Sequence, residues 1–169
     1  MSGAPYASLS PDRVLAAIEA VGLLTDGRLL ALNSFENRVY QVGIEDAAPV
    51  VAKFYRPQRW PDAAIAEEHA FAAELAAAEL PVVAPLVLDG ATLHHVEGFR
   101  VAVYPRRGGR APTLESPEHL AWMGRLIARI HALLRRTGMI TDRLIVSGNL
   151  SYDPIARELT VDGVPTLLS

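Results

Sequence analysis

Lys53 is the only lysine in the chain, and it lies inside the apolar run Val-Val-Ala-Lys-Phe-Tyr of residues 50–55. The chain holds 16 lysine and arginine residues, so every other strong cation is an arginine, and arginine supplies the ordinary surface charge. An ammonium group within a strand loses hydration on folding unless an anion lies close to it. The fold is therefore constrained to bring an anionic partner to this strand.

The composition places the chain among soluble globular proteins. Its 169 residues are 50% hydrophobic and 21% charged, which suits one domain or two small lobes. A formal net charge of -3 gives no basic surface for nucleic acid, so we expect no direct nucleic-acid partner. No stretch approaches the ~18 uninterrupted apolar residues of a membrane span, and the first residues lack the features of a signal peptide. We expect a cytoplasmic protein without a membrane partner.

The chemistry open to the chain is limited to oxygen and nitrogen groups. There are no cysteines, which excludes a disulfide framework, a thiolate nucleophile and a cysteine-ligated zinc site. The histidines show no H-x-x-x-H or His-carboxylate spacing, and His69 is assigned an ordinary role on a predicted helix. We therefore expect no histidine metal site.

Helix and strand signals follow one another in an informative order. Ser10 as N-cap and Pro11 at the first helical position predict a helix that ends near Gly22. Three β-rich runs come next and are interpreted as antiparallel strands, at residues 28–32, 38–44 and 50–55, with a hairpin loop at 45–49. A second helix is predicted over about residues 61–79, followed by short strands at 86–88, 92–96 and 99–104.

These elements predict an α+β fold. Residues 1–105 are predicted to form a five-stranded antiparallel sheet with one packed helix. In residues 106–169 we expect a linker, because the segment 105–112 breaks regular structure, and then a long helix that begins near Ser116.

Glu68 is the predicted partner of Lys53. Positions 65, 68, 72, 75 and 79 recur at the spacing of one helical face, so Glu68 shares a stripe with Ile65 and Leu75. Glu67 is turned to a mixed face, where its carboxylate is solvated. A strand lysine facing a glutamate on the next helix is the arrangement with which protein kinases hold the α- and β-phosphates of ATP. The alternative is an ion pair that only bridges sheet and helix, or a lysine whose head reaches solvent at a strand edge.

Several segments resemble the bacterial stress response kinase A family. They are residues 32–42 (Leu-Asn-Ser-Phe-Glu-Asn-Arg-Val-Tyr-Gln-Val), 50–57 (Val-Val-Ala-Lys-Phe-Tyr-Arg-Pro), 59–60 (Arg-Trp), 67–69 (Glu-Glu-His), 81–85 (Pro-Val-Val-Ala-Pro), 98–105 (Gly-Phe-Arg-Val-Ala-Val-Tyr-Pro), 108–110 (Gly-Gly-Arg) and 130–132 (Ile-His-Ala). The resemblance covers about residues 6–135. It implies the aminoglycoside phosphotransferase and choline kinase type of protein-kinase-like fold, with residues 1–105 as the N-lobe and residues 106–169 as a linker and an incomplete, truncated helical C-lobe. An incomplete lobe would expose apolar surface on the helix between Leu120 and Leu134. The resemblance further implies a cytoplasmic, ATP- and magnesium-dependent serine/threonine protein kinase linked to stress survival.

The resemblance also implies roles for individual residues. Lys53 becomes the phosphate-binding lysine and Glu68 its helix partner. Residues 33–38 become the loop over the phosphates, with backbone N–H groups and the Ser34 hydroxyl as donors, although the loop has no glycine. For Ser34 and Asn37, ordinary turn chemistry is an equal alternative. The hinge beside adenine falls at residues 103–104, Val103 and Tyr104, and Pro105 cannot donate there because it has no N–H.

The groups needed for phosphoryl transfer are missing from the sequence. Transfer in this fold needs an aspartate that orients the acceptor hydroxyl, an asparagine five residues later and a further metal-binding aspartate. No His-Gly-Asp-x-x-x-x-Asn sequence occurs in residues 1–169. Residues 146–163 faintly resemble the segment after the catalytic loop, which would make Asn149 and Asp162 magnesium ligands, but Leu144 stands five positions before Asn149. The alternatives are a strand–turn–strand filler, or a tail made by a frameshift or truncation.

Two functions remain open at this point. In the first, the chain is a truncated ATP-dependent phosphotransferase that carries the ATP-binding lobe without the catalytic loop. Its partners are a nucleotide and, in the full-length family, a protein with a serine or threonine acceptor; we expect no catalytic aspartate and no useful phosphate transfer by this chain alone. In the second, it is a non-catalytic nucleotide-binding or regulatory module, similar to a pseudokinase.

Overall fold

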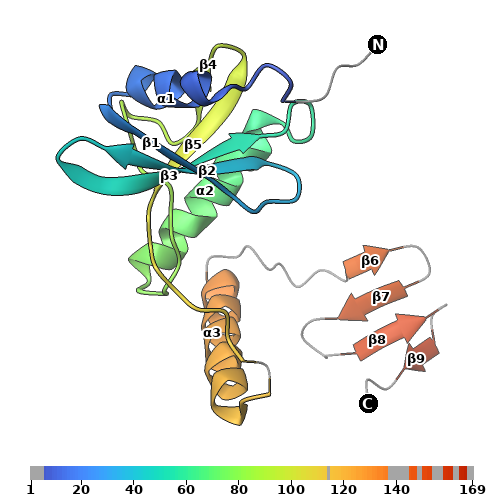
Figure 1. Ribbon diagram of the computed structural model, residues 1–169. Coiled ribbons are helices and arrows are strands. Elements are labelled where there is room, and N and C mark those ends of the chain that lie inside the picture. The colour runs from blue at the N-terminus through green and yellow to red at the C-terminus, as the bar shows by residue number, and fades with distance from the viewer. Residues whose placement is uncertain are drawn as a thin grey trace. The chain divides into compact units, whose positions relative to one another are not determined.

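The structure is a computed structural model that describes residues 6–113, 115–136, 145–147, 150–153, 158–161 and 164–166. The chain divides into two compact units, Met1–Ala111 and Pro112–Ser169 (Figure 1). Each unit has its own elements and is described by itself.

The first unit is built around a five-stranded antiparallel sheet. Its strands, in the order in which they lie side by side, are β1 (Thr25–Leu32), β2 (Arg38–Ile44), β3 (Ala47–Tyr55), β5 (Phe99–Pro105) and β4 (His94–Val96). Helix α1 (Pro11–Ala20) precedes the sheet, and α2 (Asp62–Ala77) follows β3. The predicted α+β fold, with five strands and one helix inserted after the strand that bears Lys53, is confirmed.

The two helices lie on opposite faces of the sheet (Figure 1). On the α1 face, alternate residues of β3 and β5 join a continuous apolar cluster with Val14 and Ile18 of the helix. Val42 and Ile44 of β2 also belong to it, and its residues from β3 and β5 are Val50, Ala52, Phe54, Phe99, Val101 and Val103. The residues between them face α2, as the two-residue period of a strand requires. The smaller cluster there consists of Tyr55, Ile65 and Ala102, with Leu93 and Tyr104 packed against it.

Local sequence explains the ends of these elements. The Ser10 side chain accepts from the Arg13 N–H at 3.4 Å, as an N-cap does, and Pro11 occupies the first turn of α1. The hairpin between β2 and β3 differs from the prediction, because only Glu45 and Asp46 form the turn and β3 already begins at Ala47. Asp46 takes a φ of 53°, a conformation that Asp tolerates better than most residues, and this allows so short a turn.

The prediction of a strand at residues 86–88 was wrong. In the described structure, Leu88 forms only an isolated bridge with Ala91, and the Leu86 N–H donates to the carbonyl of Val103 at 2.7 Å. The segment is therefore irregular: Leu86 is held against β5, and Leu88 precedes the turn at Asp89 and Gly90. A run of three apolar residues is too short to establish a strand.

The second unit contains α3 (Pro117–Arg136) and a four-stranded antiparallel sheet of β6 (Ile145–Ser147), β7 (Leu150–Asp153), β8 (Glu158–Val161) and β9 (Val164–Thr166). The described strands agree with the strand–turn–strand alternative for residues 146–163. Asn149 and Asp162, the weak candidates for magnesium, lie outside the described residues, as does Leu144. On α3, Leu120 and Ile127 are 49% and 52% exposed. Within the described part of the chain, no helix is long and apolar enough to cross a membrane.

Candidate functional site

The structure brings Lys53 and Glu68 together. Lys53 lies on β3 between Val39 of β2 and Ala102 of β5, and its side chain emerges on the α2 face. Its Nζ lies 2.9 Å from Oε1 of Glu68, on the second turn of α2. The lysine side chain is 21% exposed and the glutamate side chain 57% exposed. The pair is therefore accessible to a ligand.

This ion pair contributes little to the stability of the fold. Pairs in contact with solvent typically contribute about 0.2–1 kcal/mol, because water screens them and both side chains lose freedom. Replacing Lys53 with an apolar residue would cost the fold little.

A buried polar network lies beside the ion pair. The Tyr55 hydroxyl is 2.7 Å from Nε2 of His69 and 3.2 Å from the Tyr104 hydroxyl, and the Tyr104 hydroxyl is 3.3 Å from the same Nε2. Nδ1 of His69 lies 2.8 Å from Oγ1 of Thr92. His69 is only 2% exposed. The network joins β3, β5, α2 and the segment before β4.

Burial sets the protonation of these groups. Burial raises the pKa of both the Tyr55 and the Tyr104 hydroxyl, so both stay protonated and can donate. Burial lowers the pKa of His69, and the positive charge of Lys53 lowers it further against the opposite effect of Glu68. The imidazole is therefore neutral near pH 7, with one nitrogen that donates and one that accepts.

Sequence reasoning missed Tyr55 and His69 as parts of this site. Tyr55 follows Lys53 by two residues and must share its face of the sheet. His69 lies four residues after the buried Ile65, on the same side of α2, and directly after Glu68. These spacings, combined with the Lys53–Glu68 prediction, were the available signal.

The loop of residues 33–37 is held by its own side chains. The Ser34 hydroxyl donates to the Asn37 carbonyl at 2.6 Å, and Oδ1 of Asn37 accepts from the Arg56 N–H at 3.2 Å. Glu36 forms an ion pair with Arg59 at 3.0 Å. Phe35, at the tip, is 99% exposed. The observed contacts of Ser34 and Asn37 hold the turn together, as ordinary turn chemistry does. A role toward phosphates would therefore belong to the loop as a whole and not to these two side chains alone.

Arg100 fixes the start of α2. The Arg100 side chain is only 14% exposed. Its guanidinium donates to Asp62 at 3.0 Å and to the carbonyls of Arg56 and Trp60. The guanidinium lowers the pKa of Asp62, which also pairs with His95 at 2.9 Å. The first turn of α2 is thereby tied to β5, one strand away from Lys53.

The two predicted hinge residues face opposite sides of the sheet. The Val103 side chain is fully buried in the α1-face cluster, and its carbonyl accepts from Leu86. Tyr104 faces α2 and takes part in the network with His69. Any contact of Val103 with a ligand would therefore use its backbone, whereas Tyr104 offers a ring and a hydroxyl.

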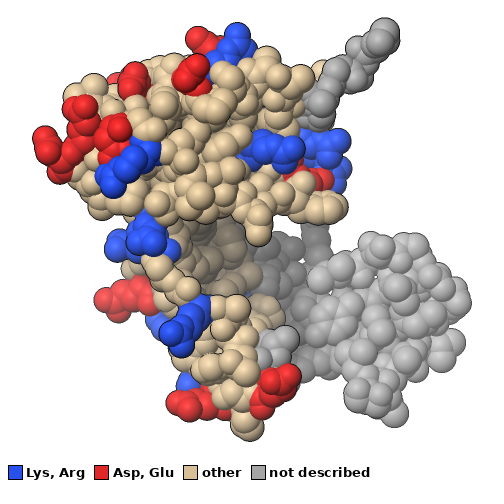
Figure 2. Space-filling model, viewed as in Figure 1, with Lys and Arg blue, Asp and Glu red and all other residues tan. Residues whose placement is uncertain are grey.

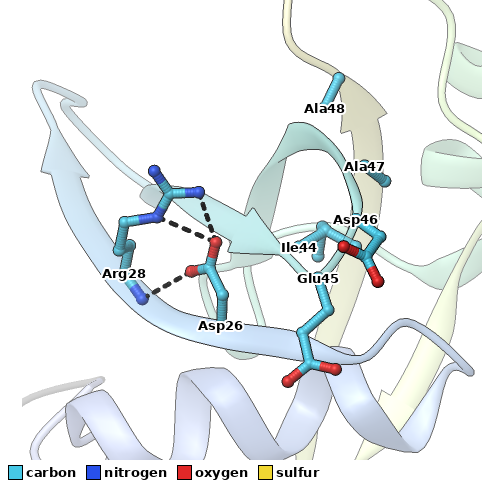
Figure 3. A pocket seen from close by; sticks show the side chains of 7 residues that line it. All are labelled: Asp26, Arg28, Ile44, Glu45, Asp46, Ala47 and Ala48. Atoms are coloured by element: carbon cyan, nitrogen blue, oxygen red, sulfur yellow. Dashed lines mark hydrogen bonds and ion pairs between the residues drawn. The ribbon is translucent and has the colours of Figure 1, made fainter.

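A surface hollow also exists at the opposite end of β3, around the β2–β3 turn (Figure 3). It is lined by Asp26, Arg28, Ile44, Glu45, Asp46, Ala47 and Ala48, and Arg28 bonds to the Asp26 carboxylate there. None of the predicted site residues lines it. A smaller hollow lies beside Glu68 and is lined by Trp60, Ala64 and Ile65.

The charge distribution around these sites is mixed. On the face drawn in Figure 2, basic and acidic side chains of the described residues are interspersed, and no broad basic patch is visible. Among the described residues, no group of three or more histidine or carboxylate side chains could hold a metal ion. The Lys53–Glu68 pair is therefore distinguished by its position in the fold and not by a concentration of like charge around it.

Comparison with known proteins gives this pair a context. Residues 28–159 match the model of the phosphotransferase enzyme family. The chain belongs to that family. The match spans β1 to β8 and so includes Lys53, Glu68, His69 and Tyr104.

Individual relatives within the phosphotransferase family are kinases. The chain is 41% identical over 131 residues to stress response kinase A of Escherichia coli strain K12, and 40% identical to the serine/threonine protein kinase RdoA of Salmonella typhimurium. Stress response kinase A of Shigella flexneri is also 40% identical. Each match covers 78% of this chain but 40% of the relative, so the chain spans less than half the length of these proteins. The predicted resemblance to stress response kinases is confirmed.

Proposed function

We propose that residues 6–111 are the ATP-binding part of a kinase-like phosphotransferase. The observation that carries this proposal is the 2.9 Å contact between Lys53 and Glu68, on a strand and the following helix, in a member of the phosphotransferase family. In this arrangement the glutamate holds the ammonium in place, and the ammonium neutralises the charge of the α- and β-phosphates.

In this proposal, the residues around the ion pair have specific roles toward the nucleotide. The loop of residues 33–38, with Ser34 and Asn37, covers the phosphates, and Val103 and Tyr104 lie beside the adenine. The ammonium of Lys53 supplies a compact charge with three donors, which suits phosphate oxygens. Magnesium enters with the nucleotide, because Mg²⁺ in such sites is held largely by the substrate phosphates and by water.

The acceptor in this proposal is a serine or threonine of another protein, by analogy with the relatives named protein kinases. A second candidate function is a nucleotide-binding regulatory module that transfers no phosphate. Robust ATP-dependent phosphorylation by the purified 169-residue chain would exclude this second candidate.

Titration with a fluorescent ATP analogue, with and without magnesium, tests the binding proposal. We expect saturable binding to the wild-type chain, weakened about tenfold or more in Lys53→Ala because a charged partner of the phosphates is lost. Glu68→Gln should weaken binding less, since the lysine keeps its charge. Arg13→Ala is the matched control, because it removes one cation from α1, where Arg13 pairs with Glu97.

The proposal fails if a folded wild-type chain binds no analogue, or if Lys53→Ala binds as tightly as the wild type. Circular dichroism of each variant establishes folding before the titration is interpreted.

A further inference from the structure

We propose that Tyr55, together with His69 and Tyr104, is a positioning cluster that sets the geometry of the Lys53–Glu68 ion pair. The use of that pair for phosphates rests on the proposed function, but the positioning itself does not. The Tyr55 ring contacts Lys53, and its hydroxyl contacts His69, the residue after Glu68. Phosphate binding by the ion pair does not by itself require these contacts.

Tyr55 is the centre of the cluster because it acts on both sides of the pair. The face of its ring lies 4.5 Å from Nζ of Lys53, close enough for a cation–π contact that restrains the ammonium. Its hydroxyl meets Nε2 of His69 at 2.7 Å, the shortest contact of the network. Since His69 follows Glu68 directly, this bond fixes the turn of α2 from which the glutamate extends.

The hydrogen bonds of the cluster form an unbroken chain. Nδ1 of the neutral His69 lies 2.8 Å from Oγ1 of Thr92, and Nε2 lies 2.7 Å from the Tyr55 hydroxyl, so one ring nitrogen donates and the other accepts in either tautomer. The Tyr55 and Tyr104 hydroxyls share a further hydrogen bond at 3.2 Å. Each polar group has a partner, which is the condition under which a buried network stiffens a structure instead of weakening it.

The ion pair needs such support because the attraction between its two charges is too weak in water to hold both side chains in place. More than half of the Glu68 side chain is exposed, and water competes for both charges. The α2 face also has few apolar anchors, since only Ile65, Leu75 and His69 of the helix are buried. The bond between Tyr55 and His69 is therefore a main restraint on the distance between β3 and the middle of α2.

Within the cluster, Tyr104 connects the ion pair to the proposed adenine site. Tyr104 lies on β5 at the proposed hinge, and its ring packs edge-on against His69 with 6.2 Å between the ring centroids. A ligand that moves the Tyr104 hydroxyl would change the bonds of Tyr55 and His69, and through them the pair. Binding at the adenine end and at the phosphate end is coupled in this geometry.

The single lysine allows the positioning to be measured without a nucleotide. In a chain labelled with ¹³C,¹⁵N-lysine, every side-chain lysine signal comes from Lys53. Glu68→Gln gives the position of this signal when the pair is lost. We expect Tyr55→Phe, which keeps the ring and removes only the hydroxyl, to move the signal toward that position, and Tyr104→Phe to move it less. Tyr40→Phe is the matched control, because Tyr40 packs against Phe54 on the α1 face.

A second measurement connects the cluster to binding. In titrations with the fluorescent ATP analogue, Tyr55→Phe should weaken binding about tenfold in the wild-type background and have no further effect in Lys53→Ala, as coupled residues do in a double-mutant cycle. A merely structural role would lower the melting temperature and leave the lysine signal in place.

The outcomes separate the two proposals. If the lysine signal moves as expected but the wild-type chain binds no analogue, the positioning stands and the nucleotide proposal fails. If binding depends on Lys53 while Tyr55→Phe changes neither the signal nor the affinity, the positioning is wrong and the nucleotide proposal stands. A shift in Tyr40→Phe as large as in Tyr55→Phe also overturns the positioning.

Discussion

The two faces of the five-stranded sheet are made by the same strands, yet they bury different chemistry. Beneath α1, Phe54 and its alternate neighbours form a continuous apolar cluster with the helix. Beneath α2, Lys53 and Tyr55 meet Glu68 and His69 in a polar network with a small apolar base. Strand alternation thus separates the residues that stabilise the fold from those of the candidate site. Substitution of adjacent residues on one strand tests this separation.

The largest effect is expected for Phe54→Ala. Phe54 is fully buried, and its ring packs edge-on against Tyr40 and Phe99. Loss of the ring leaves a cavity and should lower the free energy of unfolding by about 3–5 kcal/mol. Urea denaturation followed by circular dichroism measures this. Phe35→Ala, at a residue 99% exposed, is the control and should stay within about 0.5 kcal/mol of the wild type.

Arg100→Ala should give the next largest effect and act on the α2 face alone. It removes the donors for Asp62 and for the carbonyls of Arg56 and Trp60. We expect a loss of about 1–3 kcal/mol of unfolding free energy and faster amide hydrogen exchange at the start of α2. Unchanged exchange in α2 would show that the helix is held elsewhere.

Acidification should weaken the α2 face through His69. Its pKa is lowered in the folded chain by burial, so the unfolded chain binds more protons between that lowered value and the ordinary value of 6.5. The contribution of His69 is complete above pH 6.5 and is lost as the pH falls from 6.5 through the lowered pKa. Unfolding free energies measured between pH 7.5 and 5 should fall in the wild type and fall less in His69→Gln.

His94 provides the comparison on the other face. Burial lowers its pKa as well, and its Nε2 has no hydrogen-bond partner among the described residues. His94→Leu should therefore also flatten the pH dependence, and it should not lower the stability at pH 7.5. If His94→Leu removes the whole dependence, the contribution assigned to His69 is wrong.

The smallest effect on stability is expected for Lys53→Ala, at the residue next to Phe54. An accessible ion pair contributes about 0.2–1 kcal/mol, so urea denaturation should barely distinguish this variant from the wild type. A loss above about 2 kcal/mol would mean that Lys53 belongs to the core after all, and that the two faces are not separate in their roles.

Much of this arrangement could be predicted from the sequence, because strands and helices have different periods. The β-rich run around Lys53 predicted its strand, and the helical spacing selected Glu68 over Glu67. The predicted α1, its Ser10 cap and the five strands of the sheet followed from equally local signals.

The rest depended on contacts between distant segments. The bond between Tyr55 and His69 joins residues of two elements, and the only sequence signal for this histidine was its spacing from Ile65 and Glu68 on the helix. The start of β3 at Ala47 depended on the φ of Asp46, which composition does not fix. Residues 86–88 contain strand-forming side chains, but only Leu88 forms a β-bridge, to Ala91 across the turn, and one bridge does not make a strand.

The alternation in β3 also has an evolutionary consequence. Insertion or deletion of one residue between Ala47 and Tyr55 would exchange the two faces, moving an ammonium into the apolar cluster and a phenyl ring into the candidate site. Relatives should therefore preserve the length of this strand and vary in length at the Glu45–Asp46 turn. In an alignment, a gap inside β3 would mark a chain that has given up either this fold or this site.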